Sequence, residues 1–308
     1  MTDDLPDLPD FDERRTRWAV RRGLLRTATL VIAILVAVTV LSTLGSRWIQ
    51  QRGDREDRML DVLGQALQIA NPGYVIVQDE CCDTSLTSMG FKVAIRPLRA
   101  HGGFFVGGSF ADRTFDVEQS LFGRVKSPPM GYATETSLTY GLYNVGTGNQ
   151  PKEQSRKVLA RLPEDMNALA VVEFAKPLTV EEAQAFRLRH QVSPTRVVYE
   201  NRPRATPITW GVGDFPTPMP KDESEVAADF ALELKGLRGW VATLRDYDEA
   251  NLRPFGLDLA RLRKVAADGL AYAYVDELVT VKKLRELIED PLVRTVRVAD
   301  LSYDLERP

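Results

Sequence analysis

The most distinctive pattern along the chain is an apolar stretch near its beginning, TATLVIAILVAVTVLSTLG, residues 27–45. A helix of this length, rising about 1.5 Å per residue, spans roughly the 30 Å hydrocarbon core of a bilayer. A secretory signal peptide has a shorter apolar region and a small-x-small cleavage site, which is not evident here. A buried helix of a soluble protein is seldom apolar on every face. The pattern therefore predicts a retained transmembrane helix over residues 27–46.

The next pattern is amphipathic and helical. Apolar side chains recur at helical spacing, at Met59, Val62, Leu63, Ala66, Leu67 and Ala70. The Asn-Pro-Gly at 71–73 ends the run, because proline and glycine interrupt a helix. We predict a juxtamembrane helix within residues 47–72 that continues the membrane span and packs against the following domain. The repeat is too short to indicate a coiled coil.

Short β-type runs follow between residues 73 and 150. They read GYVIVQD, FKVAIRPL, GGFFVGGSF and TSLTYGLYNV, and Gly, Pro, Ser and Thr separate them as in β-hairpins. The third run, GGFFVGGSF, lacks the lysine and the Ser/Thr of a phosphate-binding loop, so we interpret it as a strand with glycine bends. Residues 73–150 are therefore predicted to be a β-rich region.

One strand–helix pattern occurs twice within residues 151–308. AVVEFAKPLTVEE, residues 170–182, aligns with AYAYVDELVTVKK, residues 271–283, at an offset of 101 residues. Thr179 and Thr280 stand where a helix N-cap is expected, and a second β-type run follows each helix. Strands joined by a helix need a common sheet to bury their apolar faces. We therefore predict two β-α-β units that form two halves of one sheet.

Two further helical patterns, at residues 223–244 and 257–269, are predicted to cover that sheet. Trp210, Phe215 and Trp240 could line a pocket, although aromatic residues at this spacing more often belong to a core. The predicted fold is a mixed α+β fold. It has a single N-terminal transmembrane helix, a β-rich middle region and a C-terminal domain, residues 151–308, of two β-α-β units with covering helices.

Charge sets the predicted topology. Six arginines precede the apolar stretch and four follow it, namely Arg14, Arg15, Arg17, Arg21, Arg22 and Arg26, then Arg47, Arg52, Arg55 and Arg58. The positive-inside rule, which short segments obey best, predicts that residues 1–26 are cytoplasmic and that residues 47–308 lie outside the cytoplasm. The predicted membrane-interface anchors are Trp18, Arg21, Arg22, Arg26 and Trp48. The net charge of −3 gives no indication of a nucleic-acid partner.

The predicted cytoplasmic tail has an acidic half, DDLPDLPDFDE, and a basic half. In one interpretation the acidic half is solvated and the arginines form a basic collar that faces the lipid. In the other, the tail is a short linear motif in which Leu5, Leu8 and Phe11 are the apolar anchors for a cytoplasmic partner.

Candidate chemistry is sparse. Cys81 and Cys82 are adjacent, with Cα atoms expected about 3.8 Å apart, closer than the 4.4–6.8 Å or so usual for disulfides. A redox-sensing pair, two structural thiols and an intermolecular bridge remain open. Neither His101 nor His190 lies in a catalytic or metal-binding motif, and two cysteines are too few for a disulfide framework. We predict no enzymatic activity, no cofactor and no metal site.

Several segments, taken in order, resemble one protein family. After the anchor come LYNVGTGNQ (142–150), LAVVEFAKPLTVEEAQ (169–184), WGVGDFP (210–216) and LAYAYVDELVTVKKLRELIEDPLVRTVRVADL (270–301). This order resembles the sigma-factor regulator family of bacterial membrane anti-sigma factors, which have an N-terminal anchoring part and a C-terminal extracytoplasmic domain. The resemblance extends over residues 20–301 and is strongest over 142–301.

The resemblance implies a regulator of transcription. Its exterior domain would sense the state of the envelope or a partner protein, and its cytoplasmic end would hold an alternative sigma factor inactive. A tail of 26 residues cannot build a helical sigma-binding domain, so it would act as a linear motif or recruit a second subunit. The alternative hypothesis is a membrane-anchored exterior binding or scaffold module of the cell envelope or division machinery.

Overall fold

The computed structural model describes residues 13–50, 55–85, 87–100, 113–120, 122–126, 136–202, 206–211 and 229–303. They belong to two compact units, one of residues 1–53 and 85–87, the other of residues 54–84 and 88–308. The described helical part of the first unit is α1 (Glu13–Gln50), and the second unit contains two antiparallel sheets with their helices.

Helix α1 is long and exposed. Over Val20–Gly45 it is apolar enough, by length and composition, to be a candidate membrane span, and none of its most apolar part is buried. Its threonine hydroxyls are satisfied within the helix, since Thr27 and Thr39 each donate to the carbonyl four residues earlier at 2.8 Å. The candidate span begins before the stretch predicted from sequence, at Val20, but the uncharged surface begins only after Arg26.

Helix α2 (Arg55–Ala70) belongs to the second unit. Its apolar side chains are buried in the core of that unit, as the spacing predicts. The helix ends at Asn71, whose side chain Nδ2 donates to the Leu67 carbonyl at 2.8 Å. Gln68 then joins the helix to the following strand, because its Nε2 donates to the Tyr74 carbonyl and its Oε1 accepts from the Ile76 amide. This agrees with the predicted packing of the juxtamembrane helix on the domain.

The small sheet has the order β1-β2-β3-β4 with antiparallel neighbours. Its strands are β1 (Tyr74–Thr84), β2 (Ser88–Pro97), β3 (Arg113–Ser120) and β4 (Val125–Lys126). In β2 the residues at every second position, Met89, Phe91, Val93 and Ile95, are buried. This alternation places one face of the sheet on the core and leaves the other to solvent. The glycine-rich run GGFFVGGSF lies outside the described residues.

The predicted strand TSLTYGLYNV is wrong, because this segment forms helix α3 (Ser137–Tyr143). Thr136 is the N-cap and its hydroxyl accepts from the Thr139 amide at 3.1 Å. Leu138 and Leu142, four residues apart, are both buried on one side of the helix. The Thr- and Tyr-rich composition favours a strand, but packing against the large sheet outweighs so weak a local preference.

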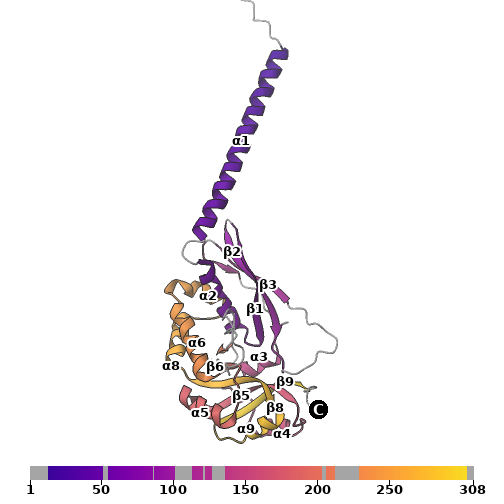
Figure 1. Ribbon diagram of the computed structural model, residues 1–308, viewed down its shortest axis with the longest axis vertical. Helices are drawn as coiled ribbons and strands as arrows, with labels where there is room; N and C mark the ends of the chain where they lie inside the picture. Colours follow the sequence, from indigo (N-terminus) through magenta and orange to yellow (C-terminus); the bar gives the residue numbers. More distant parts are fainter. Residues whose placement is uncertain are drawn as a thin grey trace, which may run out of the picture. The chain divides into compact units, whose positions relative to one another are not determined.

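The large sheet interleaves the two repeated segments (Figure 1). Its order is β7-β6-β8-β5-β9, with antiparallel neighbours throughout, and its strands are β5 (Asn167–Leu178), β6 (Arg196–Glu200), β7 (Ile208–Trp210), β8 (Ala271–Thr280) and β9 (Val293–Ser302). The strands of β5-α5-β6 flank β8, and those of β8-α9-β9 flank β5. This is a split β-α-β arrangement instead of two adjacent halves.

The helices of the two segments begin as their sequences indicate. Thr179 caps α5 (Val180–His190) in a capping box, in which its hydroxyl accepts from the Glu182 amide and the Glu182 carboxylate accepts from the Thr179 amide. Thr280 caps α9 (Val281–Leu287) by accepting from the Lys283 amide at 3.2 Å. Glu182 thus has a structural role at the start of α5.

The remaining helices are short and pack around the sheets. They are α4 (Lys152–Leu159), α6 (Phe230–Thr243), α7 (Glu249–Leu252) and α8 (Leu259–Asp268), with 3-10 turns at Asp246–Asp248 and Arg253–Phe255. Helix α8 ends at Gly269, whose φ of 60° is in the left-handed region that glycine adopts readily. Helices α6 and α8 correspond to the two covering helices predicted from sequence.

The large sheet has a core on each face. Ala168, Ala170, Val172 and Phe174 of β5 belong to the larger core, which extends to α2, α5, α6 and the small sheet. The alternate residues Leu169 and Val171 belong to a smaller core with Leu138 and Leu142 of α3. The sheet is thus buried on both faces, which explains why β5 is almost continuously apolar.

Candidate functional site

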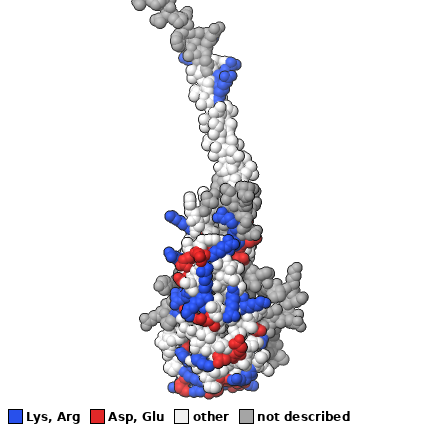
Figure 2. Space-filling view, turned by 90° about the vertical axis from the view of Figure 1, so that its left-hand side faces the viewer, with Lys and Arg blue, Asp and Glu red and all other residues white. Residues whose placement is uncertain are grey.

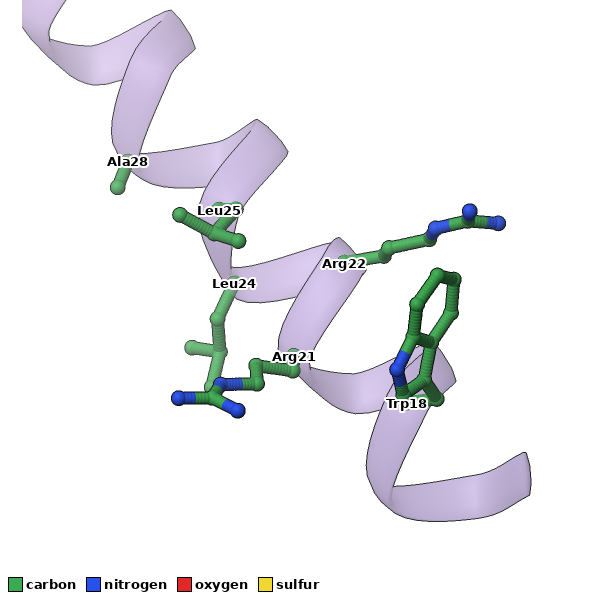
Figure 3. Close-up of a pocket in the computed structure, with 6 residues that line it drawn as sticks. All are labelled: Trp18, Arg21, Arg22, Leu24, Leu25 and Ala28. Carbon is green, nitrogen blue, oxygen red and sulfur yellow. The ribbon is translucent and has the colours of Figure 1, made fainter. Parts of the chain in front are cut away.

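The N-terminal end of α1 carries the clearest group of exposed functional side chains. Trp18, Arg21 and Arg22 lie on adjacent turns and border a shallow hollow on the helix surface, whose other lining residues are Leu24, Leu25 and Ala28 (Figure 3). The Arg22 guanidinium carbon lies 3.9 Å from the centre of the Trp18 ring, a cation–π contact. The sequence predicts the two arginines and the tryptophan as anchors, and the structure brings these three together.

Positive charge is concentrated at this end of α1 (Figure 2). The blue side chains lie before the white apolar stretch, as expected for the end of a membrane helix that faces phosphate headgroups. Arg26, the fourth predicted anchor of this end, is exposed one turn further along. Trp48 lies in α1, but its side chain is outside the described residues, as are Leu5, Leu8 and Phe11 of the tail.

Cys81 and Cys82 lie in β1, where the structure joins their sulfur atoms in a disulfide between adjacent residues. Cys81 is exposed and pairs with Phe91 of β2, whereas Cys82 packs partly against the larger core. The strand register shifts around this pair. A redox-sensing role for the two cysteines stays a prediction.

A buried ion pair links β5 to the edge strand β9. Glu173 and Arg297 are 2% and 7% exposed at their side chains, and the Arg297 Nη1 donates to the Glu173 Oε2 at 2.6 Å. The Glu173 Oε1 also accepts from the Gly146 amide, and Arg297 donates to the Asn144 carbonyl. The loop after α3 thus supplies both a donor and an acceptor, so that this charge pair holds α3 on the sheet.

His190 and Asp290 join the two repeated segments at the C-terminal ends of their helices, since His190 ends α5 and Asp290 follows α9. The His190 Nε2 lies 2.7 Å from the Asp290 Oδ2, and the centres of the Phe186 and imidazole rings lie 4.6 Å apart with the rings tilted by 45°. Burial acts to raise the pKa of Asp290, but hydrogen bonds from the Leu292 amide and His190 outweigh it and lower that pKa. Asp290 therefore acts as a structural acceptor between α5 and β9. His101 lies outside the described residues.

Asp276 is a buried carboxylate of β8, with 3% exposure. Burial raises its pKa to about 6, against the effect of hydrogen bonds from the backbone amides of Leu278, Ser193 and Val279. It lies where β8 bulges against β5, since Ala170 pairs with Asp276 but Ala168 pairs with Val279. The carboxylate accepts the amide of Leu278 at 3.1 Å and so closes the bulge.

The aromatic candidates for a pocket belong to the core. Trp210 and Trp240 are 5% and 7% exposed, with ring centres 5.8 Å apart, and the Trp240 indole donates to the Asp61 carbonyl of α2. Phe215 lies outside the described residues. The pair therefore fixes α6 against α2 and does not line an open site.

Among the described residues, no group of three or more His, Cys, Asp or Glu side chains is placed to hold a metal ion. No protein-family model, curated protein or solved structure matches this chain.

Proposed function

We propose that this chain is a single-pass membrane regulator of the anti-sigma type. In this proposal α1 crosses the cell membrane, the cytoplasmic tail restrains an alternative sigma factor, and the domain that begins at α2 receives a signal outside the cytoplasm. The observation that carries the proposal is the exposed apolar helix with arginines at its N-terminal end, because such a helix places a tail and a folded domain on opposite sides of a membrane.

The folded domain supports a binding role in this proposal. Its buried charged groups join structural elements, as Glu173 and Arg297 do between β5, β9 and α3, and as Asp290 does between α5 and β9. Of the segments that resemble the sigma-factor regulator family, residues 142–150 begin at the end of α3, residues 169–184 lie in β5 and the start of α5, and residues 270–301 form β8, α9 and most of β9. A signal received by this domain would reach the tail through α1.

The test is crosslinking in cells with the full-length, tagged protein, in which a photoreactive residue is placed in the tail or, in a second set of variants, after residue 47. We expect a sigma factor among the crosslinked proteins. Replacing Leu5, Leu8 and Phe11 with alanine should abolish that crosslink and raise transcription from the sigma-dependent promoter several-fold, because an apolar linear motif binds through a few anchors.

The matched control replaces Asp3, Asp4 and Asp7 with asparagine. It changes the same number of tail residues, but it removes negative charges and keeps the apolar anchors. This control should retain most of the crosslink. If only envelope proteins crosslink, and only to positions after residue 47, the regulator proposal fails. That result would favour the alternative of an exterior scaffold of the cell envelope or division machinery.

A further inference from the structure

The hollow at the N-terminal end of α1 combines two chemistries on one surface. Trp18, Arg22 and Leu25 follow each other at spacings of four and three residues, and Arg21, Leu24 and Ala28 lie beside them. Residues at these spacings share a face of a helix. The surface therefore begins with an aromatic ring, continues with two guanidinium groups and ends in an apolar strip that leads into the candidate membrane span.

The arginines of the hollow carry a charge that their own helix does not balance. After Glu13 the sequence of α1 contains no Asp or Glu up to Gln50. Figure 3 shows the guanidinium groups of Arg21 and Arg22 extending to either side of the helix, with Leu24 and Leu25 between them and the apolar span. Both groups are exposed, so anions can approach them from solvent or from a lipid surface.

Trp18 holds one of these arginines in place. The guanidinium carbon of Arg22 lies over the Trp18 ring, and a cation–π contact uses none of the N–H groups as hydrogen-bond donors to an oxygen, so they stay available for an acceptor. A guanidinium binds a phosphate group through two parallel N–H···O hydrogen bonds, and an oriented guanidinium loses less freedom when it does so.

We propose that this hollow binds the phosphate group of an anionic phospholipid, with an acyl chain along Leu24, Leu25 and Ala28. The apolar strip favours a lipid over free phosphate, because only a lipid has a chain to cover it. This inference rests on the proposed function, since it requires α1 to cross a bilayer. The inference adds a lipid ligand to the proposed membrane anchor. The lipid would lie at the N-terminal end of α1, next to the tail that would bind a partner.

The experiment uses the full-length protein in phosphatidylcholine vesicles with spin-labelled phosphatidylglycerol or spin-labelled phosphatidylcholine. Electron spin resonance then gives the ratio of the two lipids' association constants at the protein surface. We expect a ratio above one for the natural sequence. The Arg21→Gln/Arg22→Gln variant should lower it by about fivefold for each guanidinium removed. Trp18→Leu should lower it by about twofold, because it removes the contact that orients Arg22.

The matched control is Arg14→Gln/Arg17→Gln, which removes the same charge one to two turns further from the apolar span. It should change the ratio by less than about twofold if the hollow is the binding site. An equal loss in both double variants would overturn the proposal and leave a diffuse attraction of positive charge to anionic lipid. Competition by inorganic phosphate would also overturn it.

The same spectra separate this inference from the proposed function. If the protein restrains the motion of both lipids equally, α1 is in the bilayer and only the lipid site is wrong. If it restrains neither, α1 does not cross the bilayer, and both the lipid site and the proposed anchor are wrong.

Discussion

Two carboxylates are buried in the large sheet, and the protein holds them in different ways. Glu173 of β5 contacts Arg297 of β9, two residues beyond its directly paired neighbour Thr295, so the partner lies diagonally across the strands on the same face. Asp276 of β8 accepts hydrogen bonds from backbone amides at a bulge, and burial raises its pKa to about 6.

Burial alone therefore does not decide the role of a charged side chain. Glu173 is part of a charge pair that connects three elements, so its removal affects the packing of α3 as well as the sheet. Asp276 accepts hydrogen bonds from nearby backbone amides, and the side-chain oxygen of an asparagine could accept them as well. The first site should therefore be sensitive to loss of charge, whereas the second should be sensitive to pH.

The largest effect is expected on breaking the pair. Arg297→Met should lower the free energy of unfolding by about 3–5 kcal/mol, because it removes the buried cation that lies closest to the Glu173 carboxylate. Chemical denaturation of the full-length protein in detergent, followed by tryptophan fluorescence, would measure it. Arg294→Met is the matched control: Arg294 is 46% exposed and lies 3.3 Å from the same carboxylate, so we expect a loss below about 1 kcal/mol.

A Glu173→Met/Arg297→Met double variant sharpens this result. It should recover most of the stability that Arg297→Met loses, since two apolar side chains can replace a buried ion pair. A double variant as unstable as the single one would show that the pair's hydrogen bonds to the α3 loop, and not its charges, hold this face together.

The second effect concerns pH at Asp276. Its pKa is higher in the folded protein than in the unfolded chain, so its contribution to stability is present below about pH 4 and is lost as the pH rises through about 6. Asp276→Asn removes that loss. Between pH 4 and pH 7, the free energy of unfolding of the variant should therefore rise relative to that of the natural sequence by up to about 3 kcal/mol, in the same denaturation measurement. A constant difference across this range would contradict the assignment.

The smallest effect, opposite in sign, is expected at Asp290. Burial acts to raise its pKa, but the hydrogen bonds from Leu292 and His190 lower it in total, so its contribution is present above its unfolded pKa and is lost as the pH falls. The free energy of unfolding of Asp290→Asn should therefore decrease relative to that of the natural sequence as the pH rises from about 3 to 5. If the unfolding free energies of Asp276→Asn and Asp290→Asn changed with pH in the same direction, the two carboxylates would not have opposite pKa shifts.

Local features of the fold were predictable from sequence because they depend on local patterns. Thr179 and Thr280 indicate where two helices start, and the spacing of Met59, Val62 and Leu63 indicates the buried face of α2. The interleaving of β5 and β8 was not predictable, since strand pairing depends on contacts across about a hundred residues of sequence. For the same reason no local signal pairs Glu173 with Arg297.

The candidate lipid site lies between these extremes. Trp18, Arg21 and Arg22 could be identified from sequence because tryptophan and arginine beside an apolar stretch are typical of a membrane interface. Leu24, Leu25 and Ala28 were missed, although their helical spacing from Arg21 would have found them. Because they are apolar and adjoin the predicted membrane span, the sequence did not indicate that they also line the hollow.

The burial of α2 limits how the folded domain can be separated from α1. Helix α1 ends at Gln50 and α2 begins at Arg55, and Arg58 of α2 forms an ion pair with the buried Asp248. A protease that cut within or after α2 would remove core side chains and unfold what it released. Only cleavage before Arg55 would shed an intact domain, so any soluble, folded fragment of this protein should carry α2 at its N-terminus.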